Sequence, residues 1–151
     1  MMEKTENQNR YILPVYRVTA RVLGKKSITH QEVISAIKSG MPFKSIQALA
    51  NEYHAASKEI CYMLDINPIK LTQRKNLNLP LSLSESDRVI RFARLKEQVL
   101  IMTLGDNDVA ITWLRRAQEY LDNESPMLHA ITECGAENVG NLIGQITHGI
   151  F

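Results

Sequence analysis

The feature that most restricts the possible fold is a long apolar helix predicted in the second half of the chain. Its pattern begins at Ser84, with acidic residues in the first turn where they suit the helix dipole, and it ends at Gly105. From Val99 to Leu104 the helix reads VLIMTL and is apolar on nearly every side. A helix with this pattern must be buried on every side.

That burial can be achieved in two ways. A helical module of this size offers little apolar surface of its own, so we expect a homodimer with Val99, Ile101 and Met102 near the interface. The alternative is a monomer in which this helix is the central element of the core.

Helical periodicity and helix-end signals recur along the rest of the chain. We expect further helices between Thr29 and Gly40, from Pro42 to about His54, and from Asp106 onward. Residues 11–23 are also expected to be helical, with a strand as the alternative because the segment is rich in β-branched and aromatic residues. The predicted fold is therefore all-α.

Residues 57–75, SKEICYMLDINPIKLTQRK, have the layout of a helix-turn-helix. We expect a first helix over 58–64, capped by Ser57, and a tight turn at 65–67. A second helix then begins with Asn67 as N-cap and Pro68 at its first position. Ile66 and Leu71 are the predicted buried anchors between the two helices.

The second of these helices carries the residues suited to nucleic acid. The candidates for DNA contact, with the glutamine for a base edge and the cations mainly for phosphates, are Lys70, Thr72, Gln73, Arg74 and Lys75. Asp65 where glycine is usual, and Ile69 at a groove-facing position, count against strong base reading. The alternative is a helical module that keeps this shape but serves dimerisation.

Charge divides the chain near the same place. Residues 1–78 hold twelve Lys and Arg against six Asp and Glu, whereas residues 79–151 hold six against ten. A basic first half is compatible with a polyanionic partner, although a solvated surface has the same composition. We place a linker at 76–83 and predict three parts: a basic arm at 1–26, a helix-turn-helix module at 27–78 and a small helical module at 79–151.

The last part of the chain contains several predicted helix starts and ends. Ser125 followed by Pro126 is typical of a helix start, and we expect that helix to reach about Glu133 and to stop at Gly135. Another helix follows, with apolar residues at spacings of three and four: Val139, Leu142, Ile143 and Ile146.

The final residues differ from an ordinary polar terminus. Gly149 is expected to end the last helix, and two apolar residues, Ile150 and Phe151, follow it. Since chain ends are normally polar and frayed, this pattern indicates an end that docks into a partner. The alternative is that these residues pack on their own domain.

Several spaced motifs carry a family resemblance. The segments LSLSESDR at 81–88, GD at 105–106 and WL at 113–114 resemble the C-terminal toxin-binding module of the Xre/MbcA/ParS antitoxins. So do the tail residues SP at 125–126, Thr132, Gly135, Val139, Leu142, Ile146 and the pair His148–Gly149. Residues 27–50 resemble the segment that precedes the DNA-binding helices in the same family.

This resemblance implies an antitoxin of a type II toxin–antitoxin system whose partner is a RES-domain toxin that degrades NAD. The toxin-binding residues would be the C-terminal ones, His148, Gly149, Ile150 and Phe151, with the Phe151 carboxylate and its apolar neighbours imitating part of NAD. The helix-turn-helix would bind operator DNA and repress the operon. The alternative is a free-standing transcription regulator whose C-terminal half only dimerises.

Motifs of catalysis and metal binding are missing from the sequence. There is no phosphate-binding glycine-rich loop, no GxSxG and no HExxH, and the four histidines have no zinc spacing with Cys61 or Cys134. We therefore expect no enzyme, no metal and no cofactor. No apolar run approaches the ~20 residues of a membrane span. Two distant cysteines, both expected to be buried, indicate a cytoplasmic protein.

Overall fold

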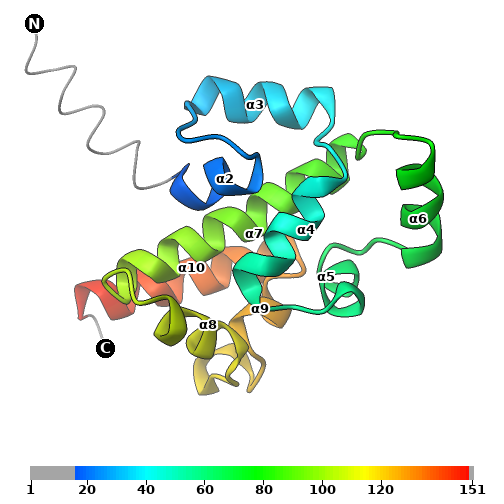
Figure 1. The fold of residues 1–151 in the computed structure, drawn as a ribbon. Coiled ribbons are helices and arrows are strands. Elements are labelled where there is room, and N and C mark those ends of the chain that lie inside the picture. The colour runs from blue at the N-terminus through cyan, green and yellow to red at the C-terminus, as the bar shows by residue number, and fades with distance from the viewer. Residues whose placement is uncertain (1–15, 150–151) are drawn as a thin grey trace, which may run out of the picture.

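The computed structural model describes residues 16–149, and in this range the chain is helical apart from one isolated β-bridge between Gln118 and Glu124. The predicted all-α fold is confirmed (Figure 1). In chain order the elements are α2 (Arg17–Val22), α3 (His30–Ser39), α4 (Lys44–Tyr53), α5 (Ser57–Met63), α6 (Pro68–Asn76), α7 (Leu83–Met102), α8 (Asn107–Arg115), the 3₁₀ helix η2 (Glu119–Leu121), α9 (Pro126–His129) and α10 (Glu133–His148).

Helix α7 runs through the middle of the molecule and contacts helices from both halves of the chain (Figure 1). Helices α2, α3 and α4 pack on it from the N-terminal half, and α8 and α10 from the C-terminal half. Its side chains Val89, Phe92 and Ala93 have no exposed surface, so they form the centre of a single core. This arrangement matches the alternative in which the long helix is the central element of the core of one chain.

The three residues predicted at a dimer interface have different environments. Val99 is fully buried in the core of its own chain, so it cannot contact a second copy, and its predicted place is corrected. Ile101 has 48% of its surface exposed and Met102 is partly buried. Of the three, only Ile101 and Met102 are accessible to a second copy, and the dimer stays a prediction.

Helix α7 begins earlier than the sequence pattern indicated. Its N-cap is Ser82 rather than Ser84, because Ser82 and Glu85 form a capping box. The Ser82 hydroxyl accepts the Glu85 backbone N–H at 3.2 Å, and the Glu85 carboxylate accepts the Ser82 backbone N–H at 2.8 Å. Ser84 was expected to start the helix, but it has Asp87 three residues on, whereas Ser82 has the glutamate that completes the capping box.

The segment predicted as a linker is largely exposed, but Leu81 fixes it to the corner between α3 and α4. Leu81 is 3% exposed, and its backbone N–H donates to the Met41 carbonyl at 2.9 Å. Gly40, with φ +85°, allows this approach, because a Cβ there would lie 2.5 Å from the Leu81 carbonyl oxygen. The Met41 N–H donates in turn to the Ser86 hydroxyl at 2.9 Å. The core thus extends across the boundary predicted between residues 78 and 79. The three predicted parts therefore remain a proposal about which residues bind DNA and which bind a partner.

The predicted stop at Gly135 is wrong. Helix α9 ends at His129, and α10 begins at Glu133 with Thr132 as its N-cap, so Gly135 lies in the first turn of α10. A Cβ at Gly135 would lie 1.7 Å from the His129 carbonyl oxygen. The glycine therefore allows two backbone segments to approach closely and does not end a helix. Because α10 runs without a break, it contains both Glu133 and Glu137.

Other boundary and burial predictions were confirmed or corrected by single contacts. The side chains of Thr29 and Asp106 cap α3 and α8 as expected. Gly149 ends α10 in the left-handed conformation, with φ +66°, also as expected. Cys134, however, is exposed, and Ala56 rather than Ser57 is the N-cap of α5. None of the helices between residues 16 and 149 is long and apolar enough to cross a bilayer.

Candidate functional site

Helices α5 and α6 form the predicted helix-turn-helix. The inward residues Ile60, Cys61 and Leu64 of the first helix and turn are 0–5% exposed, and burial raises the pKa of the Cys61 thiol. Ile66 and Leu71 are each 6% exposed, which confirms both as the anchors between the two helices.

The turn before α6 is built by two polar residues. Asp65 adopts the left-handed conformation, with φ +52°, which aspartate tolerates better than most residues. The Asn67 side chain then caps α6 by accepting the backbone N–H groups of Ile69 and Lys70 at 2.9 and 3.2 Å, and Pro68 follows at the first helical position. This local chemistry was readable from the sequence and places α6 as predicted.

Helix α6 projects at one side of the molecule (Figure 1), and Leu71 is its only buried residue. Lys70, Thr72, Gln73 and Lys75 are exposed, so four of the five predicted DNA contacts lie on an accessible surface. The Thr72 hydroxyl donates to the Pro68 carbonyl at 3.0 Å, and the Lys75 ammonium lies 5.2 Å from the centroid of the Phe43 ring.

Arg74 has a different role from its neighbours. Its two terminal nitrogens donate to the two carboxylate oxygens of Glu85 at 2.6 Å each, so that α6 is clamped to the first turn of α7. The Arg74 guanidinium lowers the pKa of Glu85 to about 2. Only 27% of the Arg74 side chain is exposed. Arg74 is thus engaged within the chain, and its contact with a DNA phosphate stays a prediction.

Two further arginines of α7 connect the helix-turn-helix with the C-terminal helices. Arg88 donates from Nε to the Leu64 carbonyl at 2.7 Å, in the turn between α5 and α6. Arg91 donates to the Ile131 carbonyl at 3.0 Å, between α9 and α10. Neither contact has a local signal in the sequence, because the partners lie 24 and 40 residues away.

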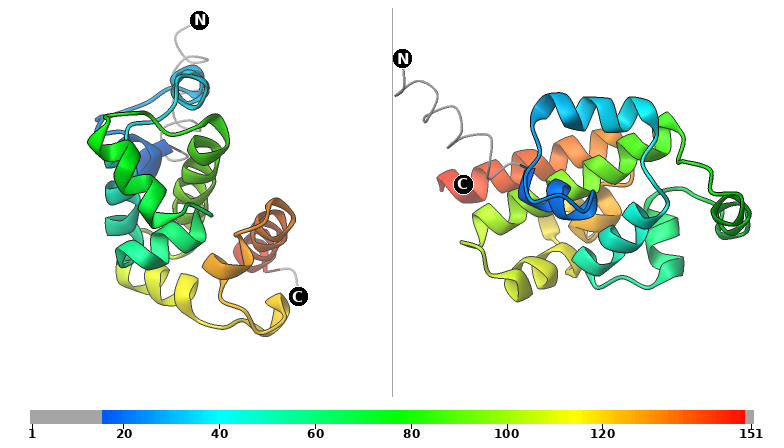
Figure 2. Two further views of the ribbon diagram at one scale, coloured as in Figure 1. Left: turned by 90° about the vertical axis from the view of Figure 1, so that its right-hand side faces the viewer. Right: turned by 45° about the horizontal axis from the view of Figure 1, so that its top comes forward.

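The predicted toxin-binding residues lie at one end of the molecule. Helices α7 and α10 pack side by side and end at the same side (Figures 1 and 2). His148 and Gly149, the last two residues of the described range, are exposed there. Ile150 and Phe151 lie outside the described residues.

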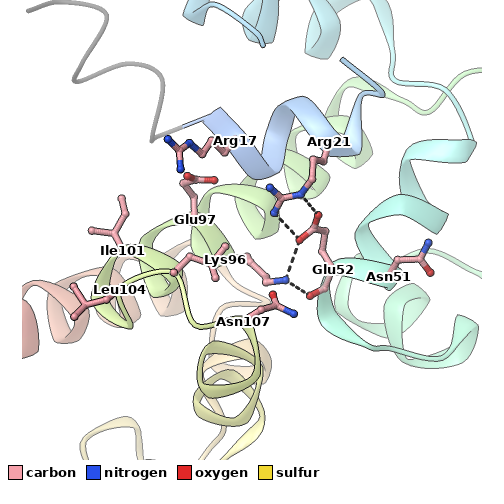
Figure 3. A pocket seen from close by; sticks show the side chains of 11 residues that line it. Arg17, Arg21, Asn51, Glu52, Lys96, Glu97, Ile101, Leu104 and Asn107 are labelled. Atoms are coloured by element: carbon pink, nitrogen blue, oxygen red, sulfur yellow. Dashed lines mark hydrogen bonds and ion pairs between the residues drawn. The ribbon is translucent and has the colours of Figure 1, made fainter. Parts of the chain in front are cut away.

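A polar hollow of about 700 Å³ lies between α2, α4 and the end of α7 (Figure 3). Lys96, 1% exposed, donates to the Glu52 carboxylate at 2.9 Å and also to the Glu52 carbonyl, and Arg21 donates to the same carboxylate at 2.6 Å. Glu97 accepts the Val18 backbone N–H at 2.7 Å, and burial raises the pKa of the Glu97 carboxyl. The sequence suggested none of these pairings.

A family model of the antitoxin Xre-like helix-turn-helix domain matches residues 32–94, from α3 into α7, and so includes both α6 and its clamp on Glu85. The match crosses the predicted 78/79 division. Within the described residues, no group of three or more His, Cys, Asp or Glu side chains is placed to hold a metal ion.

Two curated proteins are similar to almost the whole chain. Antitoxin Xre of Yersinia enterocolitica is 29% identical over 135 residues, which cover 89% of this chain and 91% of that protein. Antitoxin Xre of Photorhabdus laumondii is 27% identical over 145 residues, or 93% and 98% of the two chains. Residues 32–94 thus match an antitoxin Xre-like helix-turn-helix domain, and almost the whole chain is similar to two proteins named antitoxin Xre.

Proposed function

We propose that this protein is the antitoxin of a toxin–antitoxin pair. In this proposal its C-terminal end neutralises a RES-domain toxin that degrades NAD, and its helix-turn-helix represses their operon. The observation that carries the proposal is that α5 and α6 have helix-turn-helix geometry in a chain similar over most of its length to antitoxins. Action on DNA and on an NAD-degrading enzyme places it in the cytoplasm.

The DNA-binding half of the proposal rests on the exposed face of α6. Gln73 is free to hydrogen-bond a base edge, and Lys70 and Lys75 reach phosphates. Thr72 lies on the same helix, and Arg74 holds that helix in position through Glu85. A homodimer bound to an operator would place two copies of α6 about one DNA turn apart, ~34 Å.

The toxin-binding half rests on the end of α10. Gly149, in the left-handed conformation, ends the helix after His148 and changes the direction of the chain. Ile150 and Phe151, two apolar residues, then follow in the sequence. With His148 and Gly149 they form the segment that would enter the toxin's NAD site.

Co-expression with the RES-domain protein encoded beside this chain tests the proposal. We expect the RES protein alone to deplete cellular NAD and stop growth, and co-expression of this chain to restore both. A stable complex should co-purify. If the two proteins do not associate and NAD is still consumed, the proposed pairing is wrong.

The second candidate function is a free-standing transcription regulator. The same exposed α6 favours it, since that face needs no toxin to bind DNA. The neighbouring open reading frame discriminates between the two functions, because only an antitoxin requires a toxin gene beside its own. A salt-dependent mobility shift on the promoter is expected for both, and its absence would remove the DNA-binding half of either.

A further inference from the structure

The turn between α7 and α8 presents a leucine in an unusual backbone conformation. Leu104 has φ +56°, in the left-handed region, and 95% of its surface is exposed. Its N–H donates to the Ile101 carbonyl at 3.2 Å, and the Gly105 N–H donates to the Leu100 carbonyl at 2.7 Å. These two bonds define a Schellman helix end, in which the position held by Leu104 is usually glycine.

The other left-handed positions of the chain follow the ordinary preference. Between residues 16 and 149 the non-glycine residues with positive φ, apart from Leu104, are His54, Asp65, Asn78, Asp122 and Asn123. Asn, Asp and His tolerate this conformation because their side chains bond locally, whereas an aliphatic side chain there is strained. Leu104 alone among these six is apolar.

The fold itself gives no reason for a leucine at this position. A single exposed leucine is ordinary on a protein surface, but this one combines exposure with backbone strain, and its side chain adds almost nothing to the core. Gly105, with φ +84°, would continue the turn equally well after a glycine or asparagine. Strain that the surroundings maintain without a structural benefit is typical of a functional position.

The turn is held firmly on both sides. The Thr103 hydroxyl lies within hydrogen-bond distance of the Val99 carbonyl at 2.9 Å and of the Asp106 carbonyl at 3.2 Å. The Asp106 carboxylate accepts the Val109 N–H at 3.1 Å and so caps α8. The backbone that carries Leu104 is therefore held in place before a partner arrives, which lowers the entropic cost of binding.

Leu104 lies on the rim of the polar hollow, next to Ile101 and across from Arg17 (Figure 3). It also follows α7 at the end of the molecule where α7 and α10 both finish (Figures 1 and 2). The apolar side chain of Leu104 and the exposed residues His148 and Gly149 are therefore presented on the same side.

We propose that Leu104 is a second anchor for the toxin, inserted into an apolar recess beside the toxin's NAD site while the C-terminal residues occupy the site itself. This inference rests on the proposed function. Leu104 and Ile101 are exposed apolar side chains at the end of α7, and the proposed toxin-binding residues His148 and Gly149 are exposed where α10 ends, at the same side of the molecule (Figure 1). Leu104 and Ile101 are suited to a central contact inside a larger interface that the C-terminal segment begins.

Replacement of Leu104 separates this role from a structural one. Leu104→Gly and Leu104→Asn both relieve the backbone strain, so each variant should melt at a temperature roughly 2 to 4 °C higher than the wild type. The same variants should bind a catalytically inactive form of the neighbouring RES-domain toxin at least about tenfold more weakly by calorimetry. A gain in stability with a loss of binding is the signature of strain kept for function.

Leu77→Asn is the matched control. Leu77 is 70% exposed and also follows a helix, but its φ is −88° and it lies beyond α6, far from the end where α7 finishes (Figure 1). This variant loses a similar apolar surface and should bind the toxin like the wild type. Unchanged toxin affinity in both Leu104 variants would overturn the inference, as would a lower melting temperature in both.

Two further results separate the possible failures. If the Leu104 variants change the sedimentation of the antitoxin alone and leave toxin affinity unchanged, the side chain contacts a second copy and the inference is wrong. If wild-type protein binds the toxin and a chain ending at His148 does not, the proposed function stands, whatever the toxin affinity of the Leu104 variants. If wild-type protein binds no toxin, the proposed function itself fails.

Discussion

Arg74 of α6 and Glu85 of α7 form two parallel hydrogen bonds of 2.6 Å each, so the exposed helix of the helix-turn-helix is fixed to the central helix. Glu85 also accepts the Ser82 N–H and caps α7. One carboxylate therefore both starts the central helix and holds α6, of which only Leu71 is buried. The position of the proposed DNA-reading surface depends on this pair.

Glu85→Gln tests whether Arg74 positions α6 or contacts phosphate. The substitution weakens the clamp but leaves the Arg74 charge in place. If Arg74 positions the helix, operator affinity should fall roughly fivefold, which corresponds to about 1 kcal/mol. If Arg74 itself bound phosphate, its release from Glu85 would strengthen binding instead. Fluorescence anisotropy with labelled promoter DNA measures the affinity.

Salt dependence distinguishes Arg74 from the free lysines of α6. Lys70→Ala and Lys75→Ala should each lower the slope of log affinity against log salt by about one, because each removes a phosphate contact. Arg74→Ala should weaken binding without changing that slope. An equal loss of slope for Arg74→Ala would show that this guanidinium also neutralises a phosphate.

Acid should remove the contribution of the clamp to stability. The pKa of Glu85 lies at about 2 in the folded chain against an ordinary 4.5, so the stabilisation is complete above about pH 4.5 and is lost as the pH falls toward 2. The free energy of unfolding of the wild type should exceed that of Glu85→Gln at pH 7, and the difference should vanish near pH 2. A difference that is constant with pH would contradict the ion pair.

Two glycines of α10 should respond oppositely to alanine. Gly135→Ala places a Cβ 1.7 Å from the His129 carbonyl oxygen and should cost about 3 kcal/mol. Gly144→Ala has no atom within 4 Å of its Cβ and should stabilise the helix by about 0.5 to 1 kcal/mol. Urea unfolding followed by circular dichroism measures both. Equal effects would mean that α9 and α10 do not meet at Gly135.

In the polar hollow, two cations of different burial, Lys96 and Arg21, donate to the same Glu52 carboxylate, so their contributions to stability can be compared. Lys96→Met should destabilise the chain by about 3 kcal/mol, because its side chain is 1% exposed and Glu52 would lose a buried partner. Arg21→Met should cost less than about 1 kcal/mol, since the Arg21 side chain is 52% exposed. Thermal unfolding of the two variants should rank them in this order, and the reverse order would contradict the assigned burial.

Local chemistry made much of the fold predictable. Asn67 before Pro68, Thr29 with Glu32, and Gly149 after the last helix act through neighbours within a few residues, so their patterns are visible in the sequence. The anchors Ile66 and Leu71 followed from spacing within one motif. The helix-turn-helix and the all-α fold class could be predicted for these reasons.

Long-range contacts were not predictable from pattern. Gly135 resembled a helix stop because its partner, the His129 carbonyl, approaches only after α9 has ended. Val99 was expected at a dimer interface because the sequence does not show that α2, α3, α4, α8 and α10 together cover α7. Arg74 has the composition of a phosphate contact, and its partner Glu85 lies eleven residues away in another helix.

The central claim is that the end of the chain neutralises a toxin by contact. The most direct measurement is the rate of NAD hydrolysis by the purified neighbouring RES-domain toxin, with equimolar wild-type protein or with a chain ending at His148. Wild-type protein should abolish hydrolysis, whereas the shortened chain, still folded by circular dichroism, should leave most of it. Full inhibition by the shortened chain, or none by the wild type, would contradict the account.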